Sequence, residues 1–155
     1  MLTKWRAFKV SYPKKLKYHN KRVAITKEIS FDAAHRLVNY EGKCRNIHGH
    51  TYKLSVTISG YLNETGIVID FFEVKKMFEE LIINQFDHNF LNDIFPDINP
   101  TVDNLVVVIW EEFERYLREK GSATQDYRLE EIKLFETPTN YATLKREWML
   151  ENNET

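Results

Sequence analysis

The stretch HGHTYKLSVTIS, residues 48–59, decides the fold class because its apolar side chains alternate with polar ones. The apolar residues all fall on even positions, and they are Tyr52, Leu54, Val56 and Ile58. A period of two is typical of a β-strand with one buried face. His48 and His50 share the even positions, so both imidazoles are expected on the same face as the apolar set.

A second strand is expected just upstream, over residues 22–35. Its apolar residues fall on odd positions, with Lys27 as the exception, and they are Val23, Ile25, Ile29, Phe31 and Ala33. His35 follows at the same parity, and a polar loop, residues 36–47, separates the two stretches. If the strands pair antiparallel through this loop, the end of the first lies beside the start of the second. The sequence therefore predicts that His35 meets the other two histidines on the buried face.

Two helices are expected in the middle of the chain. The first begins at Asp70, with a glutamate three residues on as in a capping box, and ends near Gln85. The second is capped by Thr101, runs to about Lys120 and stops at Gly121. Each has an apolar stripe of helical spacing. The stripe of the first is Phe71, Val74, Phe78, Leu81 and Ile82, and that of the second is Val102, Leu105, Val106, Ile109, Phe113, Tyr116 and Leu117.

The rest of the pattern completes the fold class. Residues 86–101 predict a loop, residues 128–136 a third strand, and residues 137–144 a turn followed by a short fourth strand. The order β-β-α-α-β-β predicts an α+β fold, with one antiparallel sheet that carries two helices on one face.

Composition limits the classes of function. A length of 155 residues favours one domain, and 43% hydrophobic residues can form a core. The net charge of -1 gives no general attraction to nucleic acid or a membrane surface, and no apolar run approaches the ~20 residues of a membrane span. A single cysteine, with no signal-peptide pattern at Met1, favours a reducing, cytoplasmic setting.

The charge is uneven along the chain. From Met1 to Lys27 there are lysines and arginines but no acid. A solvated or irregular extension is the favoured interpretation of this basic segment, and an arm that meets phosphates or an acidic neighbour is the alternative. The expected organisation is a single domain over residues 1–155, with a basic N-terminal extension (1–20), a core (21–144) and a charged tail (145–155).

The three histidines predict a metal site. They offer three imidazole nitrogens, the number typical of a catalytic zinc ion whose fourth position is open, and such a metal polarises a substrate oxygen. Cys44 lies in the polar loop between cationic neighbours, where thiols ionise more readily. It is either a fourth ligand that closes the site or a general base or nucleophile beside an open one, and the spacing leaves both interpretations open.

Two further motifs carry ionisable groups. Asp87 and His88 are adjacent after the first helix, and they form either a proton relay or a capped turn with an exposed histidine. Glu136 shares the buried parity of the third strand, where an unpaired carboxylate is costly. It therefore pairs with a lysine or arginine, or it faces a pocket in which a 2-amino-pyrimidinone edge would offer it two parallel N–H donors.

Six blocks in order resemble the 6-pyruvoyl-tetrahydropterin synthase / 6-carboxy-tetrahydropterin synthase family, and they are FDAAHRL, CRNIHGHTY, GIVIDF, FDHNFLN, NPTVDN and FETP. They cover about residues 27–142. The resemblance implies the tunnelling fold (T-fold), in which subunits join their sheets into a barrel, usually as trimers stacked into hexamers, with active sites between subunits. It also implies that His35, His48 and His50 are zinc ligands.

The same resemblance implies roles for the other candidates. Cys44 matches the catalytic cysteine, which argues against a fourth ligand. Asp87 and His88 match the relay pair that reaches the cysteine of a neighbouring subunit. Glu136 matches the carboxylate that anchors the pterin ring.

Thr101 and Asp103 fall where the family often has a Thr and a Glu near the pterin, although Asp is the shorter acid. The spacing Cys-x-x-x-His-Gly-His resembles the bacterial 6-carboxy-tetrahydropterin synthases of queuosine biosynthesis. A lyase is then implied that converts 7,8-dihydroneopterin triphosphate into 6-carboxy-5,6,7,8-tetrahydropterin, acetaldehyde and triphosphate. Lys43, Arg45 and the basic arm are the candidates to meet the triphosphate.

Three alternatives compete with this interpretation. A pyruvoyl-forming member of the family would eliminate triphosphate without cleaving the side chain. A non-catalytic, zinc-stabilised pterin-binding module would use Cys44 as the fourth ligand. A nucleic-acid role for the basic arm is less favoured, because no aromatic residues are interleaved as in RNA-binding segments.

Overall fold

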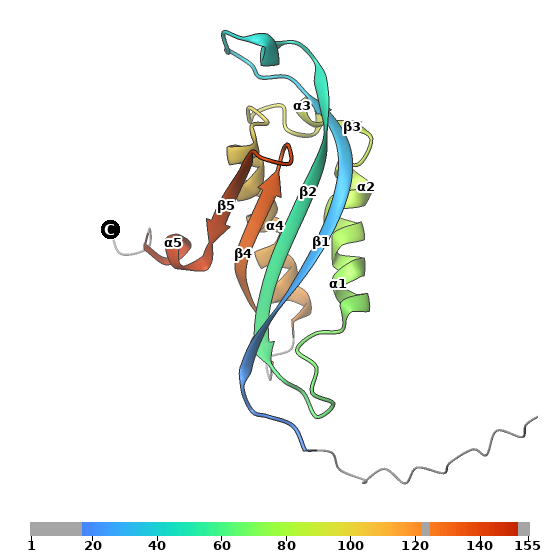
Figure 1. The fold of residues 1–155 in the computed structure, drawn as a ribbon, viewed down its shortest axis with the longest axis vertical. Coiled ribbons are helices and arrows are strands. Elements are labelled where there is room, and N and C mark those ends of the chain that lie inside the picture. The colour runs from blue at the N-terminus through green and yellow to red at the C-terminus, as the bar shows by residue number, and fades with distance from the viewer. Residues whose placement is uncertain (1–16, 122–124, 152–155) are drawn as a thin grey trace, which may run out of the picture.

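The computed structural model describes residues 17–121 and 125–151 of the chain (Figure 1). Most of the predicted basic extension, and the end of the predicted tail, lie outside these residues. The strands are β1 (Arg22–His35), β2 (His48–Tyr61), β3 (Asn89–Phe90), β4 (Arg128–Phe135) and β5 (Tyr141–Lys145). The helical segments are η1 (Lys43–Arg45), α1 (Phe71–Phe78), η2 (Glu79–Ile83), α2 (Asn84–Phe86), α3 (Leu91–Ile94), α4 (Val102–Lys120) and α5 (Arg146–Glu151).

The strands form one five-stranded sheet in the order β3-β1-β2-β4-β5. β1 and β2 pair antiparallel without a break, from Arg22 opposite Tyr61 to His35 opposite His48. The predicted hairpin and its register are therefore confirmed, as is the α+β class. The sheet is not wholly antiparallel, however, because β3 pairs in parallel with Ala33 and Ala34 of β1. The prediction of a loop over residues 86–101 was wrong in this respect, since the segment contains both β3 and α3.

One face of the sheet packs against the helices and holds the core (Figure 1). The even positions of β2 from Tyr52 onward and the odd positions near the end of β1 are buried, as the alternation predicts. A bulge between Thr57 and Ile58 shifts the pairing with β4, so Leu129 is buried together with Ile132 although their parities differ.

The first helical region departs from one regular helix. It is divided into α1, the single π-turn η2 and α2. Asp70 caps α1 as predicted, accepting a hydrogen bond from the Phe72 N–H at 2.8 Å. Phe71 was placed on the buried stripe, which was wrong: its side chain is exposed, and Met77 is buried instead. Phe71 is the first residue of α1, and the buried residues of the helix begin only at Val74.

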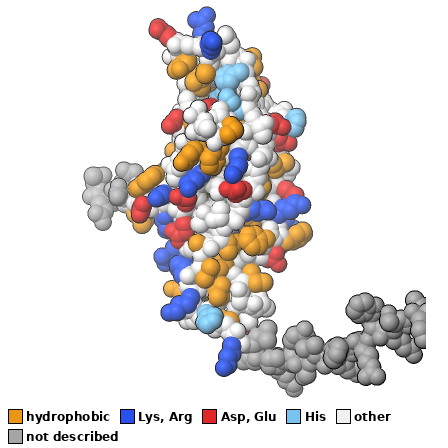
Figure 2. All heavy atoms as spheres, viewed as in Figure 1, with side chains coloured by type: hydrophobic (Ala, Val, Ile, Leu, Met, Phe, Trp, Pro, Cys, Tyr) orange, Lys and Arg blue, Asp and Glu red, His pale blue; other side chains and the backbone are white. Residues whose placement is uncertain are grey.

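The other face of the sheet is open (Figure 2), with charged side chains spread among hydrophobic ones. Lys53 pairs with Glu28 at 3.1 Å on this face and lies over the ring of Phe135, which packs against Tyr141 at a tilt of 32°. Within the described residues, no helix has both the length and the apolar character needed to span a membrane.

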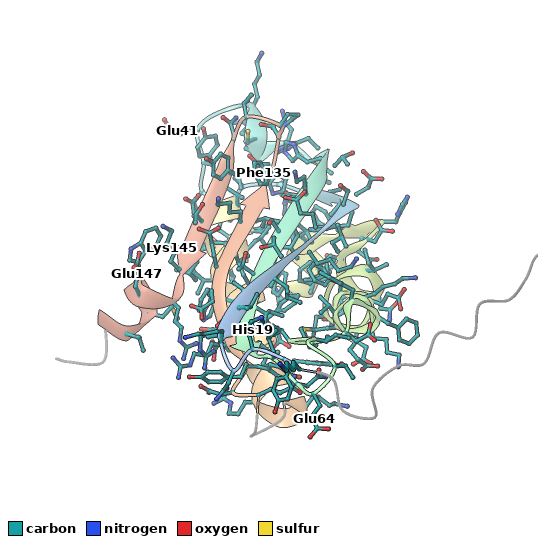
Figure 3. All side chains as sticks on the ribbon, turned by 60° about the horizontal axis from the view of Figure 1, so that its bottom comes forward. His19, Glu41, Glu64, Phe135, Lys145 and Glu147 are labelled. Atoms are coloured by element: carbon teal, nitrogen blue, oxygen red, sulfur yellow. The ribbon has the colours of Figure 1, made fainter. Side chains whose placement is uncertain are left out.

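The two ends of the sheet carry different groups. Figure 3 places Glu41, in the loop between β1 and β2, and Phe135, at the end of β4, at one end of the molecule. His19 and Glu64 lie at the opposite end. The candidate site residues belong to the first end. His19, the one histidine that is not a candidate site residue, is therefore remote from them.

Candidate functional site

The last residue of β1 and the first residues of β2 bring three histidines together. His35 faces His48 directly across the strand pair, and His50 lies two residues further along the same face of β2. Their ring centroids are 4.6 to 5.1 Å apart. His35 is almost fully buried, with 1% of its surface exposed, and the other two are half-buried. The strand register alone thus produces the cluster that the alternation predicts.

Backbone carbonyls fix how two of these rings point. The Nδ1–H of His35 donates to the Pro100 carbonyl at 2.7 Å, and the Nδ1–H of His48 donates to the Asn46 carbonyl at 2.8 Å. A carbonyl only accepts, so each ring must carry its proton on Nδ1, and in the neutral ring Nε2 is left with a lone pair. The two Nε2 atoms lie 3.1 Å apart. Two lone pairs at this distance repel each other unless a cation lies between them.

The third ring leaves an atom without a partner. His50 Nε2 is buried, and among the described residues it has no hydrogen bond. A buried polar atom of this kind is uncommon and needs an explanation. Burial is the main cause that lowers the pKa of both His35 and His50, so both rings are neutral near pH 7. Neutral imidazole is the form that binds metals.

These observations fit a metal ion bound by the three histidines. The ligand atoms of His35, His48 and His50 lie within 4.8 Å of one another. Nitrogens about 2.0–2.1 Å from a tetrahedral zinc ion would be about 3.3 Å apart, close to the separation of the first two. A bound cation would also satisfy the unpartnered Nε2 of His50.

Glu136 follows β4 directly and reaches toward the same cluster. Its Oε1 lies 3.5 Å from His35 Nε2 and 3.8 Å from His50 Nε2, and the side chain is 23% exposed. No lysine or arginine of the described residues forms an ion pair with it, so of the two predicted environments the structure shows the one without a cationic partner. The nearby Tyr52 is buried, and burial together with the Glu136 charge raises its pKa well above the usual range.

Cys44 lies in the turn η1, at the tip of the loop between β1 and β2. It is half-buried, and its carbonyl accepts a hydrogen bond from the Leu37 N–H at 2.8 Å. Among the described residues its thiol has no hydrogen bond, and it is not part of the group formed by the three histidines. Among the described residues, the structure therefore shows a free thiol in the loop that joins the two histidine-bearing strands, and no closed four-ligand set. Lys43 and Arg45 flank it and are exposed.

Asp87 and His88 form a pair at the edge of the sheet, just before β3. His88 Nδ1 lies 3.0 Å from Asp87 Oδ2, and the ring is 77% exposed. His88 has a φ of 58°, a left-handed conformation that is uncommon outside glycine and often marks functional sites. His88 borders a groove of about 540 Å³ that Asp32, His50 and Thr51 also line. The exposed His88 ring is therefore accessible to a molecule that binds in this groove.

Asp32 holds this pair in place, a role that the sequence did not predict. Its N–H donates to Asp87 Oδ1 at 2.9 Å, and its carbonyl accepts from the His88 N–H at 2.6 Å. Its own carboxylate accepts a hydrogen bond from the Thr51 hydroxyl at 2.5 Å. The bond from the Asp32 N–H, followed by the contact with His88, holds the pKa of Asp87 below its usual value. The only sequence signal was parity, which put Asp32 on the open face.

Thr101 and Asp103 lie at the start of α4. The Thr101 hydroxyl accepts a hydrogen bond from the Asn104 N–H at 3.2 Å, so this side chain caps the helix. Asp103 is exposed in the first turn, where a carboxylate favours the positive end of the helix dipole. Both have a structural role here, and a substrate contact remains a prediction.

Comparisons with known proteins show similarity to one family of synthases. Residues 24–147 match the family model described as 6-pyruvoyl tetrahydropterin synthase. The 6-carboxy-5,6,7,8-tetrahydropterin synthase of Haemophilus influenzae is 35% identical over 133 residues, which cover 76% of this chain and 94% of that protein. The 6-pyruvoyl tetrahydrobiopterin synthase of Pongo abelii is 34% identical over 139 residues, covering 79% of this chain and 91% of that protein.

A solved structure shows the same fold. The 6-pyruvoyl tetrahydropterin synthase of Caenorhabditis elegans superposes with a TM-score of 0.70 at 27% identity, covering 81% of this chain and 96% of that one. The likeness confirms the predicted tunnelling fold. The relatives named above are all synthases that act in pterin chemistry, and they carry both the carboxy and the pyruvoyl names.

Proposed function

The chain belongs to the 6-pyruvoyl tetrahydropterin synthase family, and we propose that it is a zinc-dependent lyase that converts 7,8-dihydroneopterin triphosphate and one water molecule into 6-carboxy-5,6,7,8-tetrahydropterin, acetaldehyde and triphosphate. This is a step of queuosine biosynthesis. The observation that carries the proposal is the convergence of three histidines, one with an unpartnered buried Nε2, at the end of the β1–β2 hairpin. The similarity to several 6-carboxy-5,6,7,8-tetrahydropterin synthases favours the carboxy product.

The residues that would hold zinc are His35, His48 and His50. Three imidazole nitrogens suit this ion and leave room for a substrate oxygen. The chemistry that zinc supplies when bound is the polarisation of substrate hydroxyl and carbonyl oxygens, which acidifies the neighbouring C–H and O–H groups. The carbonyls of Pro100 and Asn46 keep the rings in the tautomer that binds metal.

The other candidate residues would bind the substrate and move protons. Glu136 would accept two parallel N–H bonds from the pterin edge, which its lack of a cationic partner leaves it free to do. Cys44, as the thiolate, would remove a proton from the substrate side chain, and His88, held by Asp87, would return one. Lys43 and Arg45 would meet the triphosphate from either side of the thiol.

The thiol and the histidine that serve one site are proposed to come from different subunits of a homo-oligomer. In support, Cys44 and His88 share no hydrogen bond among the described residues, and His88 turns outward at the edge of the sheet. An exposed catalytic histidine held by three hydrogen bonds around Asp32 and Asp87 suits a role toward another chain. Trimers that assemble into hexamers are the expected arrangement.

One experiment tests the function. Purified protein loaded with zinc is incubated with 7,8-dihydroneopterin triphosphate, and the products are identified by mass spectrometry. Acetaldehyde and a carboxypterin in equal amounts are expected. The second candidate is the 6-pyruvoyl-tetrahydropterin synthase reaction, which is favoured by the similarity to 6-pyruvoyl tetrahydrobiopterin synthases. It would give a pyruvoyl pterin without acetaldehyde. A Cys44→Ala variant is expected to keep zinc and lose turnover, whereas a zinc-stabilised binding module with Cys44 as a ligand would lose zinc.

A further inference from the structure

The first three residues after β1 are held by two asparagine side chains from a distant part of the chain. Asn92 accepts from the Arg36 N–H at 2.9 Å and donates to the Arg36 carbonyl at 3.0 Å. Asn99 does the same for Val38, with distances of 2.9 and 3.1 Å. Each side-chain amide thus bonds both backbone groups of one residue, as a neighbouring strand would. The alternation of residues 36 and 38 puts both asparagines on one edge of the segment.

The other edge of this segment holds Cys44. The N–H of Leu37, the residue between the two clamped ones, donates to the Cys44 carbonyl at 2.8 Å. Leu37 points its N–H away from the asparagines because successive N–H groups of an extended chain alternate in direction. The backbone of Cys44 is therefore attached to a short extended segment that Asn92 and Asn99 fix from the opposite side.

The loop has few other means of fixing the thiol. It spans residues 36–47, and most of its side chains are exposed. Cys44 lies in the single turn η1, whose own bonds join Arg45 to Gly42 and Asn46 to Lys43. Those bonds shape the turn locally but do not connect it to the sheet.

The same segment that clamps the loop also orients the histidine cluster. The Pro100 carbonyl, one residue after Asn99, accepts the hydrogen bond from His35 Nδ1. Pro100 is buried, whereas Asn92 and Asn99 are half-buried. A shift of this segment would therefore move the thiol loop relative to the histidines. A contact that only closed the loop would need neither two hydrogen bonds from each asparagine nor a hydrogen bond from His35 to the same segment.

We propose that Asn92 and Asn99 are positioning residues that set Cys44 relative to the histidine cluster. The side-chain hydrogen bonds of the two asparagines go to Arg36 and Val38 and not to the three histidines, and neither asparagine is assigned a role in the reaction proposed above. The inference rests on the proposed role of the Cys44 thiol, and it is tested by measurements that do not depend on turnover.

The experiment compares three variants with the zinc-loaded native protein. Asn92→Asp and Asn99→Asp keep the acceptor for the backbone N–H but place a carboxylate oxygen against the backbone carbonyl. The matched control is Asn63→Ala. Asn63 also holds a loop, accepting from Thr65 N–H at 2.9 Å and Ile67 N–H at 3.0 Å, but it follows β2 at the opposite end of the sheet.

The first measurement is the rate at which iodoacetamide alkylates Cys44, which is the only cysteine of the chain. Both Asp variants should be alkylated faster, by at least about threefold, because a loosened loop opens more often. Zinc content should remain equal to that of the native protein. Asn63→Ala should match the native alkylation rate, even where its melting temperature falls as far as theirs.

The second measurement is steady-state kinetics with 7,8-dihydroneopterin triphosphate. A misplaced thiol should lower kcat by about 10- to 100-fold and leave KM nearly unchanged. The proposal is overturned if both Asp variants keep native alkylation and kcat, or if Asn63→Ala changes them equally. If the Asp variants are alkylated faster but the native protein turns over no substrate, the positioning role is supported and the proposed reaction is overturned. Asn92→Ala and Asn99→Ala, which add no charge, repeat the test if an Asp variant does not fold.

Discussion

Removing zinc should lower the melting temperature of this protein by an amount set by the free zinc concentration relative to Kd. The proposed ligands lie on β1 and β2, and only folding brings them together, so the ion binds the folded chain alone. At a free zinc concentration of 100 times Kd, this linkage stabilises the fold by about 2.7 kcal/mol. For a chain of 155 residues, each kcal/mol shifts Tm by about 2–4 °C, so chelation should lower Tm by about 5–11 °C.

The assay is thermal unfolding of the native protein and two histidine variants, with zinc and with a chelator. His50→Ala should lose the zinc response but should melt close to the native protein when both are metal-free, because His50 Nε2 makes no hydrogen bond in the described structure. His19→Ala is the control, since His19 is exposed at the far end of the sheet. The metal assignment is refuted if His50→Ala keeps the zinc-dependent shift, or if His19→Ala loses it.

Three further predictions address the subunits, a cap and acid. Equal amounts of inactive Cys44→Ala and His88→Ala subunits, co-assembled at random, should recover about a quarter of native turnover if each site takes the two groups from different chains, and none if one chain supplies both. Thr101→Ala should cost about 1 kcal/mol in urea unfolding through the lost helix cap, whereas Thr101→Ser should not; a loss shared by both would contradict the capping role. Metal-free protein should lose stability as the pH falls below 6.5. Burial lowers the pKa of His35 and His50 in the folded protein, so the unfolded chain takes up protons at a higher pH and is favoured by acid. Greater resistance to urea at pH 5.5 than at pH 7.5 would contradict this prediction.

The central part of the site was predictable because it depends on one hairpin. A period of two sets which side chains share a face, and a continuous antiparallel pairing sets which residues face each other. His35, His48 and His50 need nothing more than these two rules. The register confirms them over the full length of β1 and β2.

Other features depend on contacts that periodicity does not encode. β3 has two residues, too few to show a period, and its parallel pairing with β1 comes from tertiary packing. The bulge at Thr57 shifts the parity of β4, so Leu129 and Ile132 are both buried. Glu136 nevertheless reaches the cluster, because it follows the regular end of β4 and not the bulged one.

The orientation of the histidines was beyond prediction for a different reason. Two of the rings are aimed by the backbone carbonyls of Pro100 and Asn46, and every residue type supplies a carbonyl. The acceptor of His35 is a backbone carbonyl, which no substitution at position 100 deletes. A mutational scan would therefore not detect its role from variants at that position. It would be detected through residues that fix the path of the backbone, and Asn99 is the neighbour whose side chain does so. A variant at Asn99 is therefore the more informative probe of how His35 and the thiol loop are held together.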